Sequence, residues 1–213
     1  MSEAVTPRRA ATRERLMDAA VVMFAEKGVL GATVEEICEQ AGFSRGAFYS
    51  NFDSKDDLCL AVIQRQGLTN LAAAREVTAL ATEAIGTLDL DELIDQGVAL
   101  FAATQPQEPA DAIATIELRL YAARNPAVRA AVSTFSEEVS ATFAAVLSAA
   151  FERAGARSTI PMPQAIDLLY GACQNAALSA IIGGLETPRE VLTRQLAAII
   201  HGVTELKDDA PPV

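Results

Sequence analysis

The chain has 213 residues and is acidic, with 17 Lys+Arg against 28 Asp+Glu, a formal net charge of -11 and a pI near 4.6. Over the whole chain this charge argues against a partner as acidic as DNA. The length allows one domain of ordinary size, or a small domain joined to a larger one. Hydrophobic residues make up 51%, aromatic residues 5%, and Trp is absent. The core is therefore expected to consist mainly of Ala, Leu, Val and Ile, and to fold without disulfides or metals.

The three cysteines, Cys38, Cys59 and Cys173, are odd in number and do not have the spacing of metal ligands. The sequence therefore predicts reduced thiols on apolar helix faces, with redox sensing as the less favoured alternative. The first 12 residues are polar and lack the apolar stretch of a secretory signal, which favours a cytoplasmic protein.

The longest uncharged stretch, residues 168–185, is long enough to raise the question of a membrane span. Three glycines and the polar residues Gln174, Asn175 and Ser179 interrupt its apolar character. We therefore expect a buried helix of a soluble bundle, and no membrane association.

Apolar positions recur every three or four residues, which predicts an all-α protein. A first helix is expected over residues 12–27. The capping-box sequence of residues 33–36 starts a short second helix that ends at Gly42. Ser44 can cap a third short helix over residues 45–51.

A longer helix follows Ser54 and connects this N-terminal unit to the rest of the chain. About nine helices are expected in all. The predicted domains are residues 1–55, residues 56–207 and a disordered tail at 208–213. The remaining helices are predicted over residues 91–104, 110–123, 127–154, 163–185 and 188–206.

Two short helices joined by a turn, with a third helix packed across them, are typical of a helix-turn-helix DNA reader. Arg45 can pair bidentately with a guanine edge, and the small residues Gly46 and Ala47 permit close approach to the groove. Tyr49 is expected to face outward toward a phosphate, and Lys55 to act as a phosphate clamp. An Arg on a helix can also be merely solvated, and this alternative applies to Arg45 taken alone.

The same segment carries a longer ordered pattern of residue types. It consists of TRERLMDAA (residues 12–20), FAEKG (24–28), TVEEI (33–37), AGFSRGAFY (41–49) and NFDSK (51–55). This pattern resembles the N-terminal domain of TetR-family transcriptional regulators over about the first sixty residues.

The resemblance implies a homodimeric repressor that places two recognition helices in successive major grooves of a near-palindromic double-stranded DNA operator. A small-molecule effector bound in the C-terminal domain then releases the DNA. Residue 51 is Asn where His is frequent in the family. The segment from Arg8 and Arg9 to Arg13 resembles a basic arm that reaches DNA, or is a tail without a role. By resemblance, the backbone-contacting residues are Thr33, Ser44, Tyr49, Asn51 and Lys55, and the base-facing residues are Arg45, Gly46 and Ala47.

The resemblance also implies a four-helix dimer interface made by the last two helices of each subunit; alternatively, their apolar stripes pack inside one subunit. A mostly apolar effector is expected in a pocket lined by the middle helices. These pocket residues can equally be plain core. The predicted ligand-binding residues are Phe101, Ile116, Leu120, Phe143, Tyr170 and Asn175.

His201 is the single histidine, so no Ser/His/Asp or Cys/His arrangement can be assembled. The expectation is a protein without catalysis, metal or cofactor, with His201 at an interface or on the surface. A second hypothesis keeps the DNA reader but gives the C-terminal domain only a dimerising or activating role, without a ligand.

The acidity is unevenly distributed. Residues 1–55 contain 7 Lys+Arg and 8 Asp+Glu, a net charge of -1, which leaves 10 and 20 for residues 56–213, a net charge of -10. The low pI therefore does not exclude DNA binding by the N-terminal segment, and binding is expected to fall steeply with salt.

Overall fold

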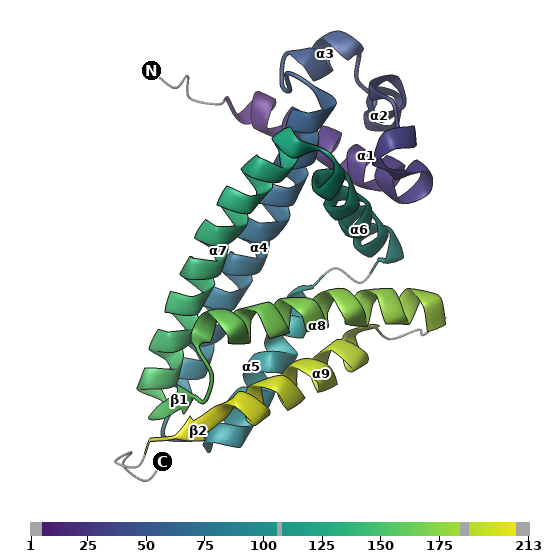
Figure 1. The fold of residues 1–213 in the computed structure, drawn as a ribbon. Helices are drawn as coiled ribbons and strands as arrows, with labels where there is room; N and C mark the ends of the chain where they lie inside the picture. Colours follow the sequence, from purple (N-terminus) through teal and green to yellow (C-terminus); the bar gives the residue numbers. More distant parts are fainter. Residues whose placement is uncertain (1–5, 106–107, 184–187, 208–213) are drawn as a thin grey trace. The chain divides into compact units, whose positions relative to one another are not determined.

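A computed structural model describes residues 6–105, 108–183 and 188–207, and in these ranges the chain is almost entirely helical (Figure 1). The predicted all-α class is confirmed. The helices are α1 (Pro7–Gly31), α2 (Val34–Ala41), α3 (Arg45–Tyr49), α4 (Lys55–Glu83), α5 (Leu90–Thr104), α6 (Pro109–Arg124), α7 (Pro126–Arg153), α8 (Met162–Gly183) and α9 (Pro188–Val203).

A short antiparallel ladder pairs β1 (Ala156–Ser158) with β2 (Thr204–Leu206), in the register that places Ala156 opposite Leu206. The sequence did not predict these strands. The last predicted helix therefore ends earlier than expected, because its final three residues pair with β1.

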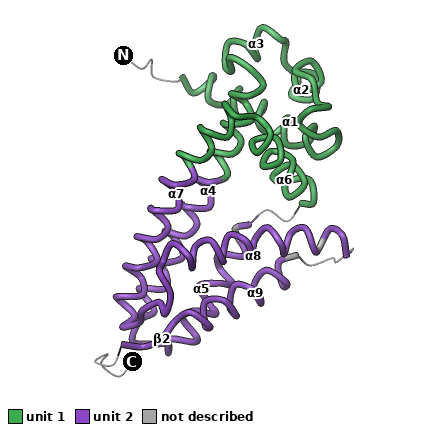
Figure 2. Tube along the Cα trace, in the orientation of Figure 1, with its two compact units in different colours: residues 1–66, 108–135 green, residues 67–107, 136–213 purple. Residues whose placement is uncertain are grey.

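The chain forms two compact units (Figure 2). Unit 1 consists of residues 1–66 and 108–135, and unit 2 of residues 67–107 and 136–213. The start of α4, α6 and the start of α7 belong to the same unit as the first three helices. The predicted tail, residues 208–213, lies outside the described residues.

In unit 1, α1 begins with Pro7 at its first position, and the Thr6 hydroxyl accepts from the Arg9 backbone N–H at 3.4 Å. Arg8 and Arg9 therefore lie exposed in the first helical turn, which corrects the expectation that they precede the helix. The core of this unit holds the largest fully buried side chains of the described chain. They include Leu16, Phe24, Ile37, Phe48, Phe52 and Leu58.

Near its end α1 is kinked at Gly28, where φ is +70°, a conformation that glycine adopts at no steric cost. A Cβ at this position would lie 2.9 Å from the Glu117 carboxylate of α6. Ala114 and Leu118, also on α6, are buried in the same core as α1. The kink is therefore part of the packing of α1 against α6.

Unit 2 has a small core where α5, α8 and α9 pack together. Within the described residues, α8 is long and apolar enough to cross a membrane. The sequence predicts instead that this helix is buried in a soluble bundle. It is little buried in the single chain, and Leu168, Leu178 and Ile182 are exposed. The expectation of burial is therefore wrong for one chain taken alone. The buried residues of this core are Ile94, Val98, Ala102, Ala176, Leu192 and Leu196.

Candidate nucleic-acid interface

The start of α2 is fixed by a complete capping box. Thr33 Oγ1 accepts from the Glu36 backbone N–H at 3.2 Å, and Glu36 Oε2 accepts from the Thr33 backbone N–H at 2.9 Å. Lys27 Nζ donates to Glu36 Oε1 at 2.6 Å. This bond, followed by those from Thr33, lowers the pKa of Glu36 to about 2. The end of α1 and the start of α2 are thereby connected.

The turn between α2 and α3 depends on Gly42, whose φ of +71° is in the left-handed region. Arg15 Nη2 donates to the Ala41 carbonyl at 2.8 Å, and its guanidinium lies 4.6 Å from the centroid of the Phe43 ring. Contacts from α1 therefore hold the turn from outside, and this fixes the direction in which α3 leaves it.

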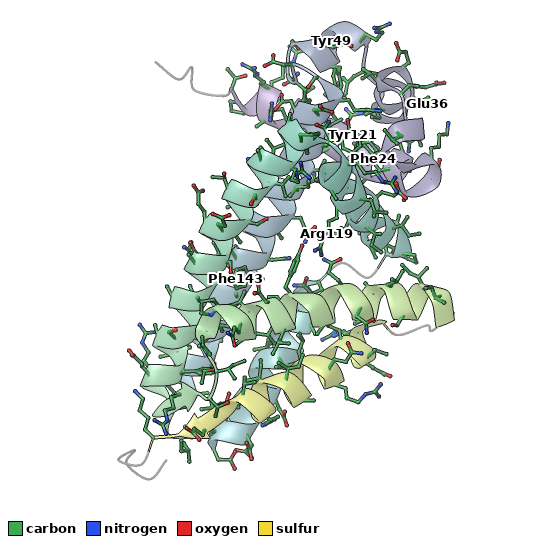
Figure 3. All side chains as sticks on the ribbon, viewed as in Figure 1. Phe24, Glu36, Tyr49, Arg119, Tyr121 and Phe143 are labelled. Atoms are coloured by element: carbon green, nitrogen blue, oxygen red, sulfur yellow. The ribbon has the colours of Figure 1, made fainter. Side chains whose placement is uncertain are left out.

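α3 is a five-residue helix that Ser44 caps by accepting from the Ala47 backbone N–H at 3.2 Å. Phe48 is fully buried and Phe52 is 1% exposed, whereas Tyr49 is 49% exposed. Figure 3 shows Tyr49 on α3, while Phe24 lies among the core side chains of α1. The predicted outward direction of Tyr49 is confirmed, and the two phenylalanines point into the core.

The exposed face at the start of α3 carries short side chains between two long ones. Arg45, Gly46 and Tyr49 are exposed and Ala47 is half-buried. A Cβ at Gly46 would meet only Ser44 Oγ, at 3.7 Å. Because glycine has no side chain, nothing projects from the helix surface at this position. Such a profile suits close approach to the floor of a major groove.

Asn51, predicted to contact the DNA backbone, is instead buried against its own helix. The residue is 8% exposed, and its Nδ2 donates to the Ala47 carbonyl at 2.8 Å and to Ser50 Oγ at 3.2 Å. Both N–H groups of the amide are thereby used, so this geometry leaves no donor for a phosphate. The side chain folds back over the end of α3, because Asn is short enough to reach its own helix.

Lys55 is also engaged by the protein. Its Nζ donates to the carbonyls of Val29 and Ala32 at 2.7 and 2.9 Å, at the C-terminal end of α1 where carbonyls lack helical partners. Two of the three N–H groups of its ammonium thus donate to protein carbonyls, which leaves one for a phosphate. Arg13, likewise expected on the DNA side, donates to the Asn51 carbonyl and lies 4.1 Å from the centroid of the Phe52 ring. Fewer cations face outward here than the sequence suggests.

One acidic residue of this surface is not among the predicted contacts. Glu35, in the first turn of α2, accepts from Arg45 Nη1 at 2.6 Å. Hydrogen bonding with Tyr49 and then the charge of Glu35 raise the pKa of Arg45. Glu35 and Arg45 stand at the starts of two helices that a tight turn joins. This arrangement is the sequence signal that indicates the pair.

The predicted ligand-binding residues belong to both units and are described within each. In unit 1, Ile116 is half-buried and Leu120 is 45% exposed. Leu120 lines an open groove of about 680 Å³ between α1 residues 25–30 and α6. In unit 2, Phe101 and Phe143 are half-buried, whereas Tyr170 and Asn175 are exposed.

The cysteines lie in apolar surroundings. Burial raises the pKa of Cys59 to about 12 and that of Cys173 to about 11, and it also raises the pKa of Cys38. Because the thiolate is the reactive form of cysteine, these thiols are poorly suited to oxidative sensing.

Comparison with known families agrees with this geometry. Residues 16–62 match the model of "Bacterial regulatory proteins, tetR family", and residues 88–202 match that of "Tetracyclin repressor-like, C-terminal domain". The chain belongs to the TetR family. Its members are DNA-binding transcriptional regulators, and the two matched segments cover the N-terminal reader and most of the remaining helices of this TetR-family protein.

Similarity to individual TetR-family members is concentrated in the N-terminal segment. The chain is 33% identical over 85 residues to the uncharacterised regulator YwcC of Bacillus subtilis, covering 40% of this chain and 38% of YwcC. It is 42% identical over 52 residues to the regulator SrpR of Pseudomonas putida, covering 24% of each. The chain thus spans well under half the length of these curated relatives.

Solved structures share the fold over nearly the whole chain. The regulator FadR of Bacillus subtilis in complex with stearoyl-CoA has a TM-score of 0.70 and 17% identity, covering 89% of this chain and 98% of that one. FadR of Bacillus halodurans has a TM-score of 0.69 and 19% identity, covering 92% and 97%. At these identities the likeness establishes the TetR-family fold alone.

Proposed function

We propose that this TetR-family regulator is a cytoplasmic homodimeric repressor that binds a near-palindromic operator and is released by a small, mostly apolar effector. The observation that carries the proposal is the low, exposed start of α3, where Arg45, Gly46 and Tyr49 lie together above the buried Phe48. A rigid helix start with a guanidinium and small neighbours is suited to reading base edges.

DNA binding is tested by anisotropy, at low salt, on duplexes selected from a randomised library by the full-length protein. The double variant Arg45→Ala with Tyr49→Ala is expected to lose specific binding while keeping its helical content. Arg157→Ala is the matched control, because this exposed arginine of β1 pairs with Glu205 in unit 2. Equal binding by the double variant and the control would contradict the proposal.

A homodimer is supported by the exposed face of α8. Leu168, Gly171, Asn175, Leu178 and Ile182 are all exposed and recur at intervals of three and four residues, which is the spacing of one helix face. A Cβ at Gly171 would meet nothing within 4 Å, so a second helix could approach closely there. Leu192 and Leu196 of α9 pack inside the chain instead. The proposed contact therefore uses the outer face of α8.

The apolar effector is supported by the apolar side chains left half-buried or exposed in both units, and by the stearoyl-CoA bound to FadR of Bacillus subtilis. Stearoyl-CoA and stearate are the probes, added separately to the protein and to its complex with selected DNA. We expect one of them to raise the thermal midpoint and to release DNA, since a ligand of the folded state stabilises it.

A second candidate function is that of a regulator whose C-terminal domain only dimerises or activates. The small buried core of unit 2 and the exposed apolar side chains of α8 favour a role of the C-terminal domain in dimerisation. Failure of the probes, and of a panel of other apolar compounds, to change either the thermal midpoint or DNA affinity would favour this candidate.

A further inference from the structure

The starts of α2 and α3 bring a carboxylate and a guanidinium together on the face proposed to meet DNA. Arg45 Nη1 lies 2.6 Å from Glu35 Oε1, and the two side chains are 60% and 54% exposed. The guanidinium also lies 5.9 Å from the centroid of the Tyr49 ring. Arg45 is thus in contact with an acid and near an aromatic ring.

The Glu35–Arg45 ion pair is expected to contribute little to the stability of the fold. Ion pairs exposed to this degree contribute little to folding, because water and salt screen them. Glu35 is not needed for capping either, because Glu36 closes the capping box of α2. A carboxylate on a DNA-facing surface also repels phosphates, so its presence lowers non-specific affinity.

The pair has the chemistry of a base-pair reader. A guanidinium donates to guanine O6 and N7 in the major groove, and a carboxylate accepts from the N4 amino group of cytosine. Thymine instead presents the O4 acceptor and a methyl group, which a carboxylate does not bind. Glu35 and Arg45 are held at hydrogen-bond distance from each other. The guanidinium donors and the carboxylate acceptor therefore enter the major groove together.

We propose that Glu35 is a specificity-determining residue that, together with Arg45, selects G·C and rejects A·T at one position in each operator half-site. Arg45 provides the attraction to guanine. Glu35 orients the guanidinium and provides the discrimination against thymine. The inference rests on the proposed DNA-binding function.

The test is selection from a randomised duplex library by the full-length wild-type protein, followed by affinity measurements on the selected duplex and its single-base-pair variants. Glu35→Gln keeps the size of the side chain and removes its charge. We expect it to reduce the G·C over A·T preference at one position by about 5-fold or more, because the amide of Gln can also donate to thymine O4. Arg45→Ala is expected to lose preference at the same base pair.

Glu39→Gln is the matched control, because Glu39 is an exposed acid one turn further along α2. It is expected to raise affinity for all duplexes by one common factor. Glu35→Asp retains the charge but shortens its reach, so partial preference is expected, and circular dichroism confirms that each variant folds.

The outcomes separate the two proposals. If wild type selects no sequence, the proposed function fails. If wild type selects a sequence but Glu35→Gln changes affinity for every duplex by the same factor, as Glu39→Gln does, the role of Glu35 is overturned and DNA binding stands.

Discussion

The two units differ in how much of their apolar surface they bury within one chain. Unit 1 encloses Phe24, Phe48 and Phe52 at 1% exposure or less. In unit 2, the buried residues of the described core where α5, α8 and α9 meet are aliphatic, and Leu178 and Ile182 of α8 are 40% and 77% exposed. Large buried rings stabilise a small domain strongly, because each removes much apolar surface from water. Unit 1 thus buries its large rings within the chain, whereas unit 2 leaves apolar side chains of α8 exposed.

The largest expected effect is in the core of unit 1. Phe48→Ala should lower the free energy of unfolding there by about 3–5 kcal/mol, because it removes a fully buried ring and leaves a cavity. Amide exchange of α1 and α2 measures the loss. Tyr49→Ala, one residue along and half-exposed, is the control and should cost much less. Similar protection in the two variants would contradict the view that unit 1 depends on this core.

The second effect concerns the open face of unit 2. Leu178→Arg with Ile182→Arg should weaken self-association by about 30-fold or more, the effect of losing central interface residues. Both side chains are exposed in the single chain, so the exchange protection of unit 1 should not change. Sedimentation velocity over a range of concentrations measures the association.

Leu30→Arg is the control for this variant, because Leu30 is 73% exposed but lies on α1. It should leave the sedimentation unchanged. If the double variant remains as dimeric as wild type, α8 does not form the interface, and the incomplete burial of unit 2 needs another explanation.

Local signals along the sequence predict unit 1 well. The capping box at Thr33, the left-handed turn at Gly42 and the outward direction of Tyr49 all depend on neighbours a few residues away. For this reason the sequence predicts the three helices of the DNA-binding segment, with helix ends correct to within five positions.

The remaining features depend on contacts between distant segments. Asn51 and Lys55 have residue types that suit phosphate binding, yet nearby carbonyls satisfy their donors. The β1–β2 ladder joins residues nearly fifty apart and has no periodic signal in three-residue strands. The exposure of α8 is not predicted, because composition identifies an apolar helix but not which other helices cover it.

A smaller effect is expected from a polar contact inside unit 1. Tyr121 of α6 donates its hydroxyl to Asp56 Oδ1 at 2.5 Å, and this bond raises the pKa of Tyr121. Asn125 Nδ2 donates to the other carboxylate oxygen at 3.1 Å. Tyr121→Phe should therefore lower the free energy of unfolding by about 1–2 kcal/mol, since a half-buried acceptor loses its partner. Chemical denaturation measures the change.

Asp56→Asn tests the same contact from the other side, since it removes the charge but keeps the size of the side chain. It should cost a similar amount, and the double variant should cost less than the sum of the two single changes. Additive effects would mean that the two side chains act independently, and that the Tyr121–Asp56 contact itself contributes nothing to the stability of unit 1.

The smallest effect is a pH dependence in unit 2. His201 of α9 lies with Nε2 2.9 Å from Asp95 and Nδ1 3.2 Å from Asp91, both on α5. The bond to Asp95 is the main cause that raises the pKa of His201 above 6.5. Because the folded state binds the proton more tightly, the contribution to stability is complete below pH 6.5 and is lost as the pH rises through the raised pKa.

The His201 side chain is 33% exposed, so screening limits this contribution to about 1 kcal/mol or less. The difference in unfolding free energy between wild type and His201→Asn should be positive at pH 6 and close to zero at pH 9. It should also shrink in 1 M salt, which screens charges but not the apolar core of unit 1. A difference that stays constant or grows between pH 6 and pH 9 would mean that α5 and α9 are held by packing alone. In that case unit 2 would resemble unit 1 in its source of stability, with only the amount of burial distinguishing them.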